Sequence, residues 1–274
     1  MPRYGLAIDT GKCVGCYNCF LTCRDEFAGN DYPGYSAPQP QSGGNWVKVI
    51  ETERGVYPHV RVDYLPVTCC HCESASCVSR DTTGAVYRRP DGIVIIDPVK
   101  AKGNKEIVSS CPYRRIEWNA ELSLPQKCTM CAHHLDAGEK EPRCVESCPS
   151  GALVFGDLDE PDSAISRLYA SGEYKPLNAD FRLDDKVCYK GLAKKFIAGT
   201  VIYGDINEVA SGAKVTLTGA GGDLATTTNG FGDFEFTGLD DNAEYTVTVQ
   251  AVGYKEIVIA ARTSRDVCLG EIRL

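Results

Sequence analysis

The sequence predicts an α+β protein in two parts: a cysteine-rich domain of short strands, cysteine loops and short helices, and then a seven-stranded antiparallel β-sandwich. Twelve of the fifteen cysteines fall into repeated short spacings between residues 13 and 148. Short apolar segments flank these spacings. From residue 196 onward, apolar and polar residues alternate in short segments between Gly- and Asp-rich turns. We expect the cysteine-rich domain at 1–156, a linker at 157–195 and the sandwich at 196–274.

The first cysteine motif has the spacing C-x2-C-x2-C-x3-C. Its members are Cys13, Cys16, Cys19 and Cys23. A [4Fe–4S] cube needs one thiolate on each iron, and a tight loop with cysteines three residues apart can supply three of them. The fourth cysteine of such a motif then ligates the other cluster of a two-cluster module. Motifs of this kind are therefore expected in pairs.

Three further motifs lie downstream. One begins with C-x2-C, resumes after an insertion with C-x3-C and closes with a proline: Cys128, Cys131, Cys144 and Cys148. Another has three cysteines in the spacing C-x2-C-x4-C: Cys69, Cys72 and Cys77. The expected fourth position of that motif is Asp81. The last motif retains only its final cysteine, Cys111, which Pro112 follows.

Pairing the outer two motifs and the inner two gives three complete ligand sets. Cluster 1 takes Cys13, Cys16, Cys19 and Cys148. Cluster 2 takes Cys23, Cys128, Cys131 and Cys144. Cluster 3 takes Cys69, Cys72, Cys77 and Cys111. A fourth cluster would need ligands at positions that hold no cysteine: Asp81, Ala101, Asn104 and Ile107. Because all four thiolates are absent together, we predict three [4Fe–4S] clusters and one vacated site.

The spacing also bears on other uses of these cysteines. Isolated C-x2-C pairs are typical of zinc sites, but four cysteines at 13–23 are too dense for one tetrahedral zinc. Disulfides are disfavoured because the adjacent pair Cys69-Cys70 suits thiolate ligation better than a disulfide scaffold. Asp81 remains an alternative iron ligand, since carboxylates sometimes replace thiolates. Three cysteines stay unassigned: Cys70, Cys188 and Cys268. Cys70 lies between two predicted ligands, and the other two are expected to be small buried residues.

Side chains close to the ligands in sequence have two open interpretations. Three histidines could donate hydrogen bonds to cluster sulfur or could simply pack: His71, His133 and His134. Six basic residues could offset the negative charge of the clusters and raise their reduction potentials, or could be ordinary surface charges: Lys12, Arg24, Arg114, Arg115, Lys127 and Arg143.

Short strands and helices are expected around the cysteine loops. The strand segments are 4–9, a hairpin of 46–51 and 59–64 around Arg54-Gly55, a pair at 84–87 and 92–96, and 151–156. This alternation of strand, ligand loop and short helix is ferredoxin-like and doubled. A helix starts after Pro161-Asp162-Ser163, places Ile165, Leu168 and Tyr169 on one face, and stops at Gly172.

The sandwich is predicted from seven segments: 196–203, 213–218, 224–228, 233–236, 245–251, 255–260 and 267–274. In the second segment Val215 and Leu217 alternate with threonines, and 245–251 alternates in the same way, so each strand has one buried face. This part contains no histidine and no catalytic constellation. We expect it to dock or shield, or to be a plain structural appendage.

Composition limits the classes of partner. The net charge of −8 argues against nucleic acid. No stretch approaches the ~20 apolar residues of a membrane span. Residues 1–4 show no leader, and fifteen thiols suit a reducing compartment, so we expect a cytoplasmic protein without direct membrane insertion.

The cysteine motifs together resemble a known family. The segments Cys13–Cys23, PVTCCHCESASC, SSCPYRRIEW and QKCTMC…CVESCPSGALVFGDLDEPDS resemble the iron–sulfur small subunits of dimethyl-sulfoxide-reductase-type molybdopterin oxidoreductases, over residues 4 to about 175. Family members usually hold four clusters, so the chain departs from them at the vacated site. Residues 196–274 resemble transthyretin-like or carboxypeptidase-regulatory-like sandwiches.

The resemblance implies an electron relay beside a large catalytic subunit that carries molybdenum with two pterins, in a heterodimer. Catalytic residues are then expected on that partner and none here. The missing cluster, the added sandwich and the lack of a membrane anchor resemble the small subunits of enzymes that transfer hydroxyl groups between phenols. The alternative is a relay subunit of a respiratory molybdopterin reductase or dehydrogenase. A third possibility is a zinc-stapled interaction protein.

Overall fold

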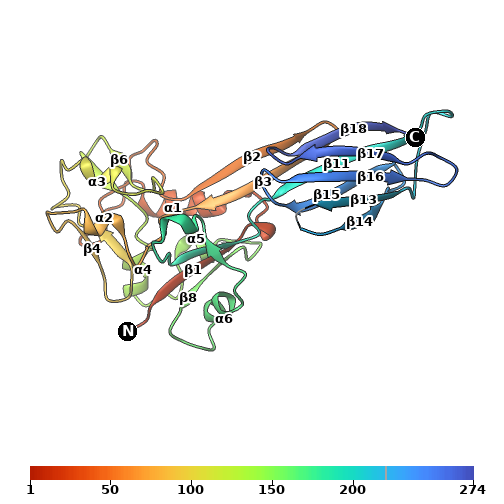
Figure 1. Ribbon diagram of the computed structural model, residues 1–274. Coiled ribbons are helices and arrows are strands. Elements are labelled where there is room, and N and C mark those ends of the chain that lie inside the picture. The colour runs from red at the N-terminus through yellow and green to blue at the C-terminus, as the bar shows by residue number, and fades with distance from the viewer. Residues whose placement is uncertain (220) are drawn as a thin grey trace. The chain divides into compact units, whose positions relative to one another are not determined.

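The computed structural model describes residues 1–219 and 221–274, and the chain divides into two compact units (Figure 1). The first unit comprises Met1–Glu51 and Tyr64–Leu192. The second comprises Thr52–Asp63 and Ala193–Leu274. In the described residues, no helix is both long and apolar enough to cross a membrane.

A four-stranded sheet forms the centre of the first unit. Its strand order is β8 (Leu153–Asp157), β1 (Tyr4–Asp9), β10 (Val187–Lys190) and β9 (Lys175–Pro176). Strand β1 is antiparallel to β8 and parallel to β10, and Leu6 lies opposite Phe155 on one side and Val187 on the other. The strands expected at 4–9 and 151–156 are confirmed.

The segment 157–195, which the sequence predicts as a linker, supplies part of this sheet. It holds α6 (Ala164–Ala170), β9, a 3-10 helix (Ala179–Phe181) and β10, and its residues up to Leu192 belong to the first unit. Helix α6 starts as predicted, because the Ser163 hydroxyl accepts a hydrogen bond from the Ser166 amide at 3.1 Å. Ile165 is fully buried against Ala7 and Cys188.

The remaining elements of the first unit are short and lie around the cysteine motifs (Figure 1). The helices are α1 (Asn18–Phe27), α2 (Ser76–Ser79), α3 (Glu106–Ser109), α4 (Ala132–Asp136) and α5 (Arg143–Glu146). The hairpins are β4–β5 (Val86–Arg88, Val94–Ile96) and β6–β7 (Glu117–Asn119, Leu124–Gln126). The doubled ferredoxin-like arrangement is thereby confirmed, and β6–β7 is an additional pair.

The hairpin of β2 (Lys48–Val56) and β3 (His59–Val67) differs from its prediction. The predicted turn at Arg54-Gly55 is wrong, since both residues lie within β2 and the chain turns at Tyr57-Pro58, a cis peptide bond. Gly55 has φ +86°, and a Cβ there would lie 2.2 Å from the His59 carbonyl oxygen. Only glycine fits where the two strands approach so closely. Gly55 therefore marks an irregularity within β2 and does not form the turn.

The second unit is a sandwich of two sheets. One sheet contains β12 (Glu208–Val209), β11 (Lys195–Tyr203), β15 (Asp233–Leu239) and β18 (Val267–Arg273). The other has the order β14 (Leu224–Thr227), β13 (Lys214–Gly219), β16 (Glu244–Gln250) and β17 (Ile257–Arg262). All seven predicted strands are present, and the two-residue β12 is an eighth.

One pair in the sandwich departs from an antiparallel arrangement. Strand β18 runs parallel to β11, because the chain crosses from β17 in the other sheet before it enters this one. The predicted alternation is confirmed, since Val215, Leu217, Val247 and Val249 are fully buried in the core between the sheets.

Candidate iron–sulfur centres

The first cysteine loop follows β1 after a single 3-10 turn (Thr10–Lys12). Gly15 and Tyr17 both have positive φ, at 65° and 61°, so the chain reverses between Cys16 and the start of α1. A Cβ at Gly15 would lie 2.4 Å from the Tyr64 ring, which only glycine avoids. Helix α1 then carries Cys19 and Cys23 four residues apart, on the same face of the helix.

The cluster 1 cysteines come together from α1, the loop before it and the segment just after α5. Burial, together with the nearby thiols of Cys13, Cys148 and Cys16, raises the pKa of Cys19 to about 11. The two helices are joined next to Cys148, where the Thr22 and Ser147 hydroxyls lie 2.9 Å apart. Cys16 is the exposed member of this set.

The cluster 2 cysteines form a second group. Burial raises the pKa of Cys144 well above its ordinary value, and the neighbouring thiols of Cys131, Cys128 and Cys23 add to this rise. The backbone also supplies a hydrogen-bond donor to this group, since the Met130 amide donates to the Cys128 sulfur at 3.2 Å. Thiols with raised pKa values become thiolates at neutral pH only when a metal replaces the proton.

The cluster 3 cysteines line a single pocket. This pocket includes all four residues of the predicted set: Cys69, Cys72, Cys77 and Cys111. Two sulfurs accept backbone hydrogen bonds of 3.5 Å, Cys69 from the His71 amide and Cys111 from the Arg115 amide. Cys70 lines the same pocket, so its exclusion as a ligand stays a prediction from spacing.

The vacated position is built differently. Ala101 and Ile107 are buried in an apolar cluster with Ala85 and Val86. The Asp81 carboxylate accepts hydrogen bonds from the Thr83 hydroxyl at 2.7 Å and from the Val86 amide at 2.8 Å. Burial would raise the pKa of Asp81, but these hydrogen bonds outweigh it and hold the pKa below its ordinary value. The carboxylate therefore stabilises a turn, and its oxygens are already in use.

The donor chemistry fits iron–sulfur clusters. The twelve cysteines form three groups of four sulfurs, and all fifteen cysteines are free thiols. Over residues 1–219 and 221–274, no group of three or more His, Cys, Asp or Glu side chains is close enough to hold a single metal ion. The thiolates of a four-iron cube lie farther apart than the four ligands of one tetrahedral zinc.

Two other cysteines and one histidine have local partners. Cys188 is buried, and its thiol donates to the Asp185 carbonyl at 3.7 Å, whereas Cys268 is half-buried in β18. His133 stacks on Tyr32, with ring centroids 3.7 Å apart, and its Nε2 lies 2.9 Å from Glu26. These contacts pack the ring of His133 and pair its Nε2 with Glu26, while its buried Nδ1 has no partner in the described residues.

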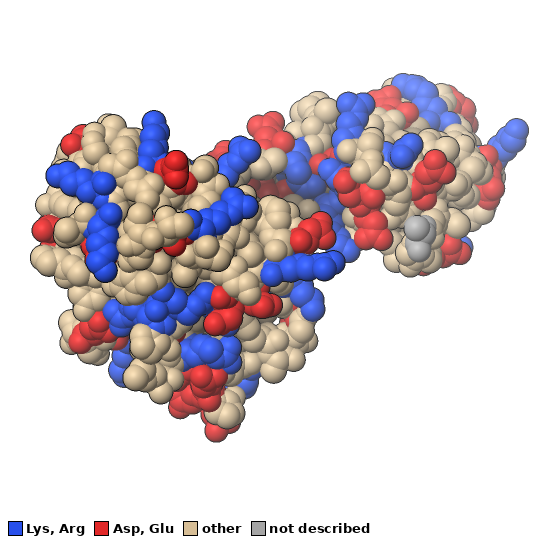
Figure 2. Space-filling model, turned by 60° about the vertical axis from the view of Figure 1, so that its left-hand side comes forward, with Lys and Arg blue, Asp and Glu red and all other residues tan. Residues whose placement is uncertain are grey.

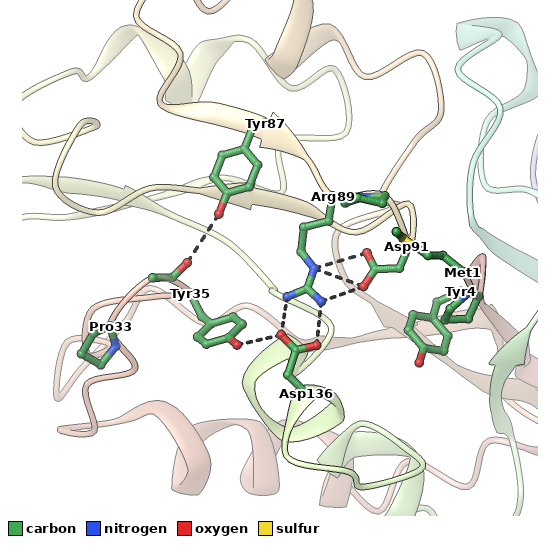
Figure 3. Close-up of a pocket in the computed structure, with 11 residues that line it drawn as sticks. Met1, Tyr4, Pro33, Tyr35, Tyr87, Arg89, Asp91 and Asp136 are labelled. Atoms are coloured by element: carbon green, nitrogen blue, oxygen red, sulfur yellow. Dashed lines mark hydrogen bonds and ion pairs between the residues drawn. The ribbon is translucent and has the colours of Figure 1, made fainter.

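The sequence did not predict an ion-pair cluster at the edge of a surface pocket. Figure 3 shows the Arg89 guanidinium between the carboxylates of Asp91 and Asp136, at 2.8 and 2.7 Å, while the Tyr35 hydroxyl donates to Asp136 at 2.7 Å. Hydrogen bonds from Arg89, opposed by burial, lower the pKa of Asp136. Because Arg89 already binds two carboxylates, this cluster joins the β4–β5 turn to α4 and does not offer Arg89 to a ligand.

The comparisons with known proteins agree with both units. The 4Fe-4S dicluster domain family matches residues 60–158, and the carboxypeptidase regulatory-like domain family matches residues 197–267. The pyrogallol hydroxytransferase small subunit of Pelobacter acidigallici is 42% identical, with 100% of both chains covered.

Shorter matches cover the cysteine-rich part. The iron–sulfur subunit of an arsenate respiratory reductase from Shewanella is 31% identical and covers 61% of this chain and 86% of its own. A subunit of the anaerobic dimethyl sulfoxide reductase of Escherichia coli is 34% identical and covers 58% of this chain and 75% of its own. The chain therefore belongs to the electron-transferring iron–sulfur subunits of the dimethyl-sulfoxide-reductase-type molybdopterin oxidoreductases.

Proposed function

We propose that this chain is the small subunit of a heterodimeric enzyme that transfers a hydroxyl group between pyrogallol and phloroglucinol. The larger catalytic partner would hold molybdenum with two pterins and the substrate. The observation that supports this proposal is the match to the pyrogallol hydroxytransferase small subunit over the whole of both chains, sandwich included. The reductase subunits named above cover only 58–61% of the chain.

We assign three [4Fe–4S] clusters to the three cysteine groups. When bound, such clusters accept and release single electrons. The chain's own residues supply twelve thiolates, backbone amides that donate to sulfur, and an apolar surround that excludes water. These are the features by which a protein sets the reduction potential of a cluster.

Transfer of a hydroxyl between two phenols involves no net oxidation or reduction. In this proposal the clusters set or restore the oxidation state of the partner's metal and do not export electrons. The vacated fourth site supports this role, because it shortens any relay away from the metal. The chain itself would contribute no catalytic residue, and the sandwich would dock or shield.

Charge and thiol content support the remaining assignments. Figure 2 shows acidic and basic side chains mixed on the visible face, and the net charge is −8, which suits a protein partner better than nucleic acid. We place the protein in the cytoplasm, since fifteen free thiols are maintained best in a reducing compartment.

The alternative is a relay subunit that serves a respiratory reductase or dehydrogenase through other carriers. The matches to arsenate and dimethyl sulfoxide reductase subunits favour it. The two functions differ in whether turnover needs an external electron carrier.

The test is anaerobic purification of the complex from its native source, with identification of the companion chain and its metal. We expect about twelve irons per small subunit, molybdenum in the companion, and pyrogallol conversion without added electron carrier. Turnover only with an external donor or acceptor would favour the respiratory alternative. About sixteen irons, or a few zinc ions in place of iron, would overturn the cluster assignment.

A further inference from the structure

His71 forms part of the wall of the cluster 3 pocket. The side chain is 1% exposed and lines the pocket together with the four cysteines of this set. Its Nδ1 accepts a hydrogen bond of 3.1 Å from the backbone amide of Val94. An imidazole nitrogen that accepts a hydrogen bond carries no proton, so the proton of the ring lies on Nε2.

The Nε2–H group of His71 is buried and has no hydrogen-bond partner in the described residues. A buried donor without an acceptor is costly, and native proteins rarely retain one. In a pocket lined by four thiols, the acceptor that would satisfy it is the sulfur of a cluster. The sequence left two interpretations of His71 open, and this geometry favours hydrogen bonding over simple packing.

Lys127 lines the same pocket and is 3% exposed. Its ammonium donates to the carbonyl oxygen of Val94 and, at 3.0 Å, to that of Cys128, a predicted ligand of cluster 2. Both acceptors are neutral, so these contacts leave a buried charge without a counterion. Such a charge is strongly destabilising unless an opposite charge lies nearby. A cube with four thiolates is negatively charged and meets this need.

One strand residue fixes both groups. Val94 in β5 donates its amide hydrogen to His71 and accepts from Lys127 at its carbonyl. The backbone of β5 therefore sets the tautomer of the histidine and the place of the ammonium. Of the six basic residues near the ligands in sequence, Lys127 is buried, whereas the other five are exposed or half-exposed.

On the basis of the cluster assignment above, we propose that His71 and Lys127 raise the reduction potential of cluster 3. His71 does so by donating a hydrogen bond from Nε2–H to a cluster sulfur, and Lys127 by its charge, which also acts on cluster 2 through its position beside Cys128. Both stabilise the reduced cluster, which carries one more negative charge than the oxidised cluster.

Redox titration of the holocomplex, followed by electron paramagnetic resonance, tests the role of His71. In His71→Leu we expect one of three one-electron transitions to become about tenfold less favourable, a fall of about 59 mV. His71→Gln is the matched control, because its amide can accept from Val94 and donate to sulfur, and we expect it to retain most of the potential. Full iron content with unchanged transitions in His71→Leu would overturn the proposal, as would an equal fall in both variants.

Lys127→Met keeps the apolar stem and removes the charge. We expect two transitions to fall, since the ammonium lies beside ligands of clusters 2 and 3. Lys102→Met removes the same charge from an exposed position and should leave all three transitions in place. Equal effects of the two substitutions would show that only net charge matters and would contradict the assignment.

The unmodified protein provides a test that does not depend on folding of a variant. Pulsed electron paramagnetic resonance of the reduced complex should detect a histidine nitrogen coupled to a cluster, identified by the change on labelling with ¹⁵N-histidine. No such coupling on any reduced cluster would overturn the His71 contact. A sample without about twelve irons would instead refute the cluster assignment, so the two failures are distinguishable.

Discussion

The cluster 3 pocket and the vacated position are the two halves of one ferredoxin-like module, and they differ in the side chains that line them. The cluster 3 half presents four thiols and a buried histidine to a pocket. The other half places Ala101 and Ile107 in an apolar cluster and uses Asp81 to hold a turn. The same backbone motif thus surrounds either four thiols or a pocket that Asp81, Asn104 and Ile107 line, with Ile107 also packed in the apolar cluster.

On the proposed assignment of three clusters, the difference shows how a protein could lack a cofactor without losing the fold around it. Removal of thiolates alone would leave a cavity lined by polar groups that lack partners, which is destabilising. Here the apolar side chain of Ile107 occupies one ligand position, and backbone amides of the following turn satisfy the Asp81 carboxylate. On the same assignment, contacts within the protein would replace the stabilisation that metal ligation provides elsewhere.

The largest expected effect comes from removing a ligand of cluster 3. In Cys69→Ala we expect about four fewer irons per chain, since a cube loses stability when one corner lacks its thiolate. Metal analysis and the visible absorption near 400 nm measure the loss. Because unfilled thiols would then remain around an empty pocket, the variant should also unfold more readily.

The adjacent residue provides the control. Cys70→Ala removes a buried thiol from the same pocket wall and should retain the full iron content. Iron loss in Cys70→Ala with retention in Cys69→Ala would reverse the assigned register. Loss in both variants would show that the pocket cannot tolerate a smaller side chain, and Cys70→Ser would then separate volume from ligation.

An intermediate effect is expected from shortening the buried side chain of Ile107 at the vacated position. Ile107 is 3% exposed, so Ile107→Ala should lower the free energy of unfolding by about 2–5 kcal/mol, through lost burial and the cavity it leaves. Urea unfolding followed by circular dichroism measures this change. Iron content should stay the same, in contrast to the cysteine variants.

Asn104→Ala is the matched substitution at another former ligand position. Asn104 is only half-buried and accepts one 3.2 Å hydrogen bond from the Glu106 amide, so we expect a loss of about 1 kcal/mol or less. If Ile107→Ala cost no more than Asn104→Ala, the apolar cluster would not be the stabilising replacement described above.

The sequence predicted those features that depend on fixed local spacing. Cysteines three or four residues apart specify a loop or one face of a helix, so each cysteine motif could be located before the structure, while the sharing of ligands between motifs stays a prediction. Alternation of apolar and polar residues in short segments specified the sandwich strands, because this pattern is also local. Ser163 could be recognised as a helix cap because the capping bond is local.

Features that depend on distant partners were missed. Strand β10 lies between β1 and β9, yet its short run Val187-Cys188-Tyr189 follows the polar residues 184–186 and has no local signal of a central strand. The roles of His71 and Lys127 depend on Val94, which is 23 and 33 residues away in sequence. Spacing alone could place both residues near ligands but could not show that they are buried.

An effect smaller than that of Ile107→Ala should come from Asp81→Asn, which keeps the size of the side chain and removes its charge. The amide oxygen can still accept one of the hydrogen bonds from Thr83 and Val86, but the NH₂ group now opposes a donor, so we expect a loss of about 1–2 kcal/mol in the free energy of unfolding. Since the folded-state pKa of Asp81 is depressed, its contribution is present above the ordinary carboxyl pKa and disappears as pH falls through the folded-state value. Iron content and all three redox transitions should remain unchanged. A loss of iron, or a shifted transition, would show that the carboxylate ligates or neighbours a cluster, and the contrast between the two halves of the module would no longer hold.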